Sequence, residues 1–102
     1  MVKDVYSMLE AFPRSETYGL TSQLKRSVIS VPSNISEGCG RRTIKDLSHF
    51  LDVAEGSLCE VETQLYLACD LGFINQSKTK RLINETTQIR KMIAGFQNSL
   101  KN

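Results

Sequence analysis

The chain has 102 residues, of which 40% are hydrophobic and 24% are charged, and its formal net charge is +2. These proportions are typical of one folded domain and exclude a disordered tail. No apolar run approaches the ~20 residues of a transmembrane helix, and the first residues do not resemble a secretory signal, so we expect a cytoplasmic protein without membrane association.

The chain contains three cysteines, Cys39, Cys59 and Cys69. None of them lies in a Cys-x-x-Cys pair. Cys59 and Cys69 are expected on one helix, about 15 Å apart at ~1.5 Å per residue, which is too far for a disulfide. We therefore predict buried free thiols in a reducing compartment.

The charge is unevenly distributed along the chain. Residues 1–45 carry seven Lys or Arg and four Asp or Glu. Residues 46–77 carry no Lys or Arg and six Asp or Glu, and residues 78–102 carry six Lys or Arg and one Asp or Glu. An acidic middle between basic flanks can pair within the chain or between subunits, or the basic parts can bind an anion. The distribution alone leaves these interpretations open.

Apolar residues recur at three-four spacing almost throughout, which predicts an all-α protein. The first helix is expected to begin at the start of the chain and to end before Pro13, since the residue before proline is pushed out of the helical region. Residues 13–17 are predicted to be a short connection. The first helix is therefore short.

The second helix is expected to start near Glu16–Leu20 and to end near Glu37, with a kink near Pro32. Gly38 and Gly40 are expected to end it in a left-handed turn. Its apolar face comprises Leu20, Leu24, Val28, Val31 and Ile35, and a polar face comprises Gln23, Ser27, Ser30, Asn34 and Glu37.

The third helix is expected to be capped by Thr43, with Asp46 in a capping-box position, and to stop at Gly72. Its main seam comprises Ile44, Leu47, Leu51, Ala54, Leu58, Val61, Leu65 and Ala68. A second stripe comprises Phe50, Val53, Ser57, Glu60, Gln64, Leu67 and Leu71. Two adjacent stripes suggest packing both inward and against another subunit. We expect Phe50, Val53, Ser57, Glu60, Gln64 and Leu67 to form an oligomer interface.

The fourth helix is expected to be capped by Asn75. Its inward face comprises Thr79, Leu82, Thr86, Ile89, Ile93, Phe96 and Leu100, and its outer face comprises Lys78, Lys80, Arg81, Arg90 and Lys91. Short connections make consecutive helices antiparallel neighbours. The predicted fold is one up-down antiparallel four-helix bundle over residues 1–102.

Enzymatic and metal sites are not indicated. A di-iron bundle needs two Glu-x-x-His motifs, whereas His49 is the single histidine. A cysteine nucleophile would have only that histidine as its base. The Gly38-Cys39-Gly40 sequence follows a predicted helix and lacks the remaining residues of a nucleotide-binding loop. We expect no catalytic activity, no metal and no cofactor.

The connection after the second helix carries Arg41, Arg42 and Lys45, which we call the basic turn. It adjoins a helix N-terminus, whose free N–H groups and dipole favour an anion, and arginine binds phosphate with two donors. This pattern predicts a phosphate-backbone contact. The alternative is a solvated loop whose arginines pair with Glu37 or Asp46.

Lesser candidates for nucleic-acid binding are Lys25, Arg26, Lys78, Arg81, Arg90 and Lys91. Aromatic residues are few and scattered, with three Tyr and four Phe. We therefore expect any nucleic-acid binding to recognise backbone and shape, not single-stranded bases.

Several sequence blocks resemble the four-helix bundle proteins encoded in intervening sequences of 23S ribosomal RNA. The longest are residues 18–26 (YGLTSQLKR) and 31–38 (VPSNISEG). Shorter ones are residues 40–42 (GRR), 49–51 (HFL), 56–60 (GSLCE), 62–65 (ETQL) and 71–74 (LGFI). The resemblance covers nearly the whole chain. Two departures are a first helix that starts a few turns late and Ser36 and Cys39 where alanine and an aromatic residue are more usual.

The resemblance implies a bacterial, ring-shaped homopentamer that repeats the basic turn around the ring. The family is similar to the accessory protein of diversity-generating retroelements, which binds nucleic acid and its reverse transcriptase. Our leading hypothesis is a non-enzymatic homo-oligomer that binds structured RNA or duplex nucleic acid through the basic turn and the basic face of the fourth helix. The alternative is a scaffold for a protein partner, such as a reverse transcriptase, without nucleic-acid affinity.

Overall fold

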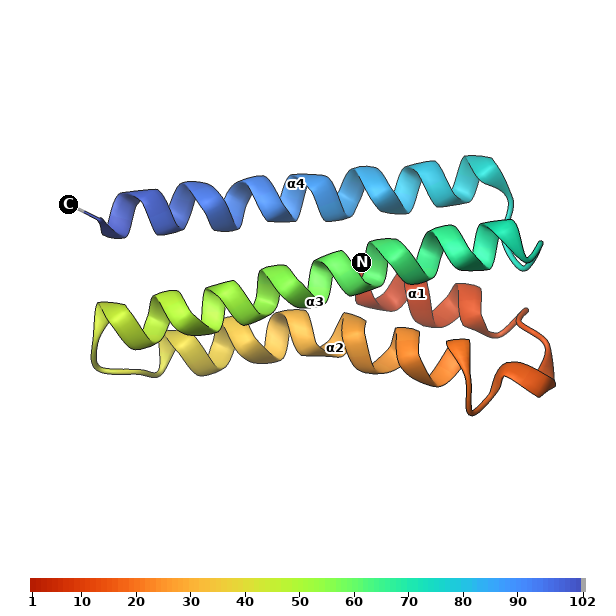
Figure 1. The fold of residues 1–102 in the computed structure, drawn as a ribbon, viewed down its shortest axis with the longest axis horizontal. Helices are drawn as coiled ribbons and strands as arrows, with labels where there is room; N and C mark the ends of the chain where they lie inside the picture. Colours follow the sequence, from red (N-terminus) through yellow and green to blue (C-terminus); the bar gives the residue numbers. More distant parts are fainter. Residues whose placement is uncertain (102) are drawn as a thin grey trace.

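The computed structural model describes residues 1–101, which are all-α without a strand. The elements are α1 (Val2–Leu9), the 3-10 turn η1 (Arg14–Glu16), α2 (Leu20–Cys39), α3 (Ile44–Asp70) and α4 (Gln76–Leu100). α3 packs against both α2 and α4, and consecutive long helices run antiparallel (Figure 1). The predicted four-helix bundle with a short first helix is confirmed. None of the described helices is long and apolar enough to cross a membrane.

α1 spans eight residues, and the chain continues through turns to Phe12 before Pro13 redirects it. The N-terminus therefore lies near the middle of the bundle's long axis (Figure 1). Residues 2–28 and 61–86 form what we call the four-helix half. Residues 29–60 and 87–101 form the three-helix half, which α1 does not reach.

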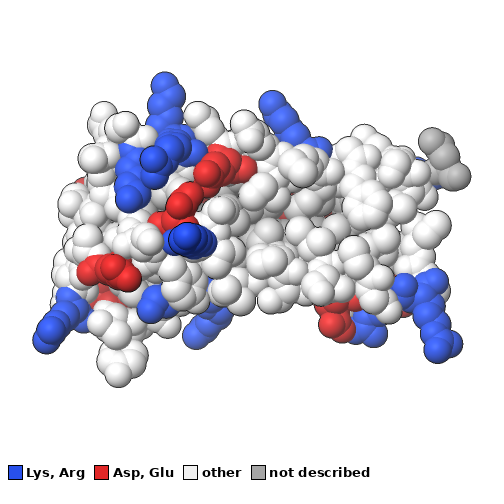
Figure 2. All heavy atoms as spheres, turned by 180° about the vertical axis from the view of Figure 1, so that it is seen from behind, with Lys and Arg blue, Asp and Glu red and all other residues white. Residues whose placement is uncertain are grey.

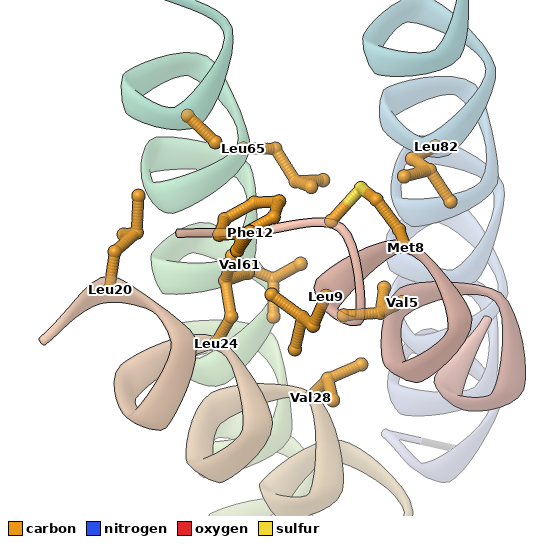
Figure 3. Close-up of a cluster of buried hydrophobic side chains, with 11 residues drawn as sticks. Val5, Met8, Leu9, Phe12, Leu20, Leu24, Val28, Val61, Leu65 and Leu82 are labelled. Carbon is orange, nitrogen blue, oxygen red and sulfur yellow. The ribbon is translucent and has the colours of Figure 1, made fainter. Parts of the chain in front are cut away.

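The core of the four-helix half contains buried residues from α1, α2, α3 and α4. Val5, Met8 and Leu9 of α1 point between the other helices, and Phe12 completes the end of the cluster (Figure 3). The Phe12 ring also lies 5.3 Å from that of Phe73, between ring centroids. α1 thus covers the core in one half of the bundle.

The core of the three-helix half is smaller. Its buried members are Val31, Leu51, Ala54, Leu58 and Ile93. Phe96, which the sequence predicted to face inward, is 42% exposed because α1 does not extend over this part of α4. Ile44, at the end of the predicted α3 seam, is exposed as well.

The polar face of α2 is paired with α3 by side-chain hydrogen bonds. Ser27 Oγ lies 2.6 Å from Gln64 Oε1, and Ser30 Oγ lies 2.7 Å from Ser57 Oγ. Asn34 Nδ2 donates to Ser30 Oγ at 2.9 Å. Because a buried polar group without a partner costs free energy, this seam favours one register of the two helices.

Helix ends agree with the sequence at two caps and differ at α2. Thr43 Oγ1 accepts from Asp46 N at 3.1 Å, and Asn75 Oδ1 accepts from Lys78 N at 2.7 Å. Gly72 has φ of 81°, as expected of a helix-ending glycine. α2 runs through Pro32 to Cys39, two residues beyond the expected end. The left-handed turn expected at Gly38 and Gly40 is wrong, since neither glycine has a positive φ.

The prediction of buried thiols is wrong for two of the three cysteines. Cys39 and Cys59 are exposed, and Cys69 is half-buried. Cys59 follows directly on the seam residue Leu58, at the outer edge of α3, so helical spacing turns its side chain towards solvent.

Candidate nucleic-acid interface

The basic turn is positioned by a close approach between the end of α2 and the start of α3. A Cβ on Gly38 would lie 2.9 Å from Phe50 Cβ and 3.1 Å from Leu47 Cδ1. Any larger residue at Gly38 would push the helices apart. The glycine therefore acts through packing, and this contact holds the turn tightly against α3.

Arg41 already has interaction partners within the chain. Its Nη2 donates to Glu37 Oε1 at 2.6 Å, and its guanidinium carbon lies 4.9 Å from the centroid of the Phe50 ring. The alternative pairing with Glu37 is thus formed. Both partners are exposed, so an ion pair of this kind contributes only about 0–1 kcal/mol and can exchange for a phosphate.

Arg42 and Lys45 are exposed and form no ion pair within residues 1–101. Thr43, between them, caps the N–H of Asp46. The first N–H groups of α3 have no acceptor within the helix, so Arg42 and Lys45 adjoin the positive end of the helix dipole. Asp46 offsets part of this charge.

The basic face of α4 divides into two parts. Lys78, Lys80 and Arg81 lie at the start of the helix, where Lys80 and Arg81 are exposed and Lys78 is half-buried. Lys91 is exposed near the middle.

Arg90 is held by α3. Its Nη1 donates to Glu62 Oε1 at 2.8 Å, and its Nη2 lies 3.8 Å from Glu55 Oε1. The hydrogen bond to Glu62 raises the pKa of Arg90, and the charge of Glu55 adds to this. Arg90 therefore joins α3 to α4 and is less available to a ligand than Lys91.

On α2, Lys25 and Arg26 are exposed in the four-helix half. Lys25 Nζ lies 5.4 Å from the centroid of the Tyr6 ring, so this cation packs against α1. Arg26 forms no ion pair in the described chain.

The structure does not bring the candidate cations into one patch. The basic turn lies at one end of a molecule 46 Å long, and the start of α4 lies at the other end (Figure 1). Seen from behind, most cations lie over the left half, a smaller group lies at the lower right, and a large uncharged area lies right of centre (Figure 2). Residues 27–36 and 92–100, which contain no charged residue, belong to α2 and α4 in this region. The candidate cations thus form two separate groups, one at each end of the molecule.

Part of the α3 stripe that was expected to form an oligomer interface instead makes contacts within the same chain. Ser57 and Gln64 are buried and bonded to α2, and Phe50 packs beside Arg41. Val53, Glu60 and Leu67 remain on the outer surface of α3 at seven-residue spacing. The sequence did not distinguish these two sets, because the stripe lies at the border between the α2 contact and solvent.

The possible metal ligands and the single histidine are dispersed over the described residues. Across residues 1–101, no three His, Cys, Asp or Glu side chains are grouped as a metal site would require. His49 is exposed, with its ring 5.4 Å from that of Phe50, between centroids.

Fold and surface together define a small all-α bundle with exposed cations near the starts of α3 and α4. The family model of the 23S rRNA-intervening sequence protein matches residues 1–95, so the chain belongs to this family. A solved structure from Bacteroides thetaiotaomicron, described as a protein of unknown function from the S23 ribosomal protein family, is similar at 22% identity with a TM-score of 0.82. The match covers 94% of this chain and 87% of that one, and it supports the fold alone. No curated protein matches the chain.

Proposed function

We propose that this protein is a non-enzymatic, homo-oligomeric cytoplasmic bundle that binds the phosphate backbone of structured RNA or duplex nucleic acid. The observation that carries the proposal is the pair of exposed cations Arg42 and Lys45, without carboxylate partners in the described chain, at the N-terminus of α3. A helix N-terminus with such cations suits an anion bound by two or more donors. Arg41 joins the contact when it leaves Glu37.

The start of α4 provides the second contact. Lys80 and Arg81 are exposed there, and the 46 Å length of the molecule corresponds to about a dozen base pairs of duplex. A rigid duplex laid along the bundle would reach both ends, whereas a short flexible strand would occupy one. This geometry favours structured nucleic acid.

Oligomerisation would multiply these contacts. Val53 and Leu67 expose apolar surface on α3, with Glu60 between them. We propose that these three residues, together with Phe50, contact another subunit. Ser57 and Gln64 hold α2 against the adjoining side of this part of α3. Repeating a weak phosphate site in a ring raises the overall affinity without any new contact.

The proposal is tested with the double variant Arg41→Ala/Arg42→Ala. Removing two phosphate contacts should weaken binding to a labelled hairpin RNA and reduce the slope of log K against log salt by about 1–2. The matched control is Lys3→Ala/Arg14→Ala, which removes two exposed cations outside the proposed contacts. Equal losses in the two variants would mean nonspecific attraction, and no loss in the first would mean that the basic turn is not the site.

The second candidate function is a scaffold for a protein partner. The ion pairs among the described residues, Arg41 with Glu37 and Arg90 with Glu62 and Glu55, favour it because they occupy cations internally. Under this proposal Val53 and Leu67 would contact the partner, for example a polymerase. Replacing both by Ser should then abolish partner capture, while the affinity for RNA would be negligible in every variant.

A further inference from the structure

A groove between α3 and α4, close to the connection at residues 71–75, is larger than the other hollows described on the surface. Its volume is about 500 Å³, against about 310 Å³ or less for the others. Small-molecule sites commonly enclose ~300–1,000 Å³. Its lining comprises Tyr66, Cys69, Asp70, Gln76, Thr79, Lys80, Ile83 and Asn84.

The groove has an apolar floor and a polar rim. Cys69, Thr79 and Ile83 are buried or half-buried, and the Thr79 hydroxyl donates to Asn75 O at 2.8 Å, which leaves its methyl group for packing. Tyr66, on the wall, is 53% exposed. A flat apolar ligand can therefore lie on the floor with its face or edge against this ring.

The rim can recognise the edges of such a ligand. Asp70, Gln76 and Asn84 are exposed, and their side chains form no hydrogen bond within residues 1–101. Together they offer amide donors, amide acceptors and a carboxylate acceptor. Lys80 adds a cation at the rim, beside Lys78 and Arg81 at the start of α4.

This combination matches a nucleobase attached to a phosphate. A simple anion would make no use of the apolar floor or of Tyr66, and an aliphatic ligand would make no use of the amides. A nucleobase has a flat face that stacks on tyrosine and edges that bond to amides and carboxylates, while its phosphate suits Lys80.

We propose that the groove between α3 and α4 binds an unpaired nucleobase, with Tyr66 as the stacking residue and Asp70, Gln76 and Asn84 at the base edges. The proposal rests on the proposed nucleic-acid function and extends it. The protein would hold a helical segment by its phosphates and would also capture one extruded or bulged base beside it. Sequence alone favoured backbone recognition only, because Tyr66 and Asn84 lie on different helices.

The test compares two labelled hairpin RNAs that differ only by a single-nucleotide bulge, each titrated with the full chain. The wild-type protein should bind the bulged hairpin more tightly by about fivefold or more, the scale of one base stacked on an aromatic ring. Tyr66→Ala should abolish this preference, and Tyr66→Phe should keep it. The matched control is Tyr18→Ala, since Tyr18 is 96% exposed at the same end of the bundle and does not line the groove.

The outcomes separate this inference from the proposed function. If both hairpins bind equally and Tyr66→Ala changes nothing, while Arg41→Ala/Arg42→Ala still weakens binding, the groove is not a base site and the proposed function stands. If no RNA binds, the proposed function fails, and free adenosine and cytidine monophosphates then test the groove. Their addition should shift the NMR methyl signals of Thr79 and Ile83 in the wild type but not in Tyr66→Ala, and absence of shifts would overturn the base site.

Discussion

The two halves of the bundle are built from the same long helices but differ in how completely their hydrophobic cores are covered. In the described chain, the core of the four-helix half has eleven buried hydrophobic residues and that of the three-helix half has five. The difference comes from α1, which with Phe12 supplies four of the eleven. In the three-helix half, Ile35, Ile89 and Leu100 remain partly exposed.

The comparison teaches that burial along α4 depends on whether α1 lies beside it, whereas α3, which packs against both α2 and α4, is buried in both halves. α4 runs through both halves with one continuous apolar spacing, yet Leu82 is fully buried and Phe96 is not. The basic turn lies at the end of the less sealed half. The groove that we assign to a nucleobase lies in the four-helix half, where α1 covers the core.

The largest expected effect comes from truncating a fully buried leucine, compared with a partly exposed one. Leu65→Ala in the four-helix half should lower the free energy of unfolding by about 2–5 kcal/mol, because it leaves a cavity in a fully buried cluster. Leu47→Ala in the three-helix half should cost about 1 kcal/mol, because Leu47 is partly exposed. Urea unfolding followed by circular dichroism measures both. Equal losses would contradict the comparison.

The polar seam between α2 and α3 should show the next largest effect. Gln64→Ala removes the interhelical acceptor of Ser27, whose hydroxyl keeps the backbone acceptors Gln23 O and Leu24 O, so we expect a loss of about 1 kcal/mol. Ser57→Ala affects a pair that is only partly buried and should cost less. The double variant Ser27→Ala/Gln64→Leu removes both polar groups and should recover most of the loss. Failure of that recovery would show that packing, and not hydrogen bonding, dominates at this position.

Hydrogen exchange sharpens the comparison without mutation. Amides of residues 79–86 in α4 should exchange about tenfold or more slowly than those of residues 93–99, since local opening needs less free energy where fewer apolar contacts are broken. Mass spectrometry or NMR on the intact chain measures both segments in one experiment. Uniform protection along α4 would mean that the helix unfolds as one unit and that α1 does not set local stability.

The fold could be predicted almost entirely from residue spacing, while the site could be predicted only in part. Three-four periodicity and the caps at Thr43 and Asn75 depend on local geometry, so the sequence contains them. The exposure of Phe96 depends on where α1 starts relative to α4, which is a tertiary property. The same holds for Arg90, whose partner Glu62 is 28 positions away on another helix.

Two structural features that were not predicted, the polar pairing of α2 with α3 and the exposure of Cys59, nevertheless have a signal in the sequence. The polar face of α2 from Gln23 to Glu37 is as regular as its apolar face, which indicates a polar partner surface on a neighbouring helix. Cys59 adjoins the seam residue Leu58, and that spacing already turns it outward. The groove beside Tyr66 carried no such signal, because its walls meet only after α3 and α4 have packed.

The most direct test of the central claim is the affinity of the wild-type chain for a labelled structured RNA and a DNA duplex, measured by fluorescence anisotropy across a salt series. Phosphate recognition by the basic turn and the start of α4 predicts binding at micromolar concentrations or tighter, with an affinity that falls steeply as salt increases. Flat titrations at low salt for both ligands would contradict the account, and the cations would then serve contacts within the protein or with a protein partner.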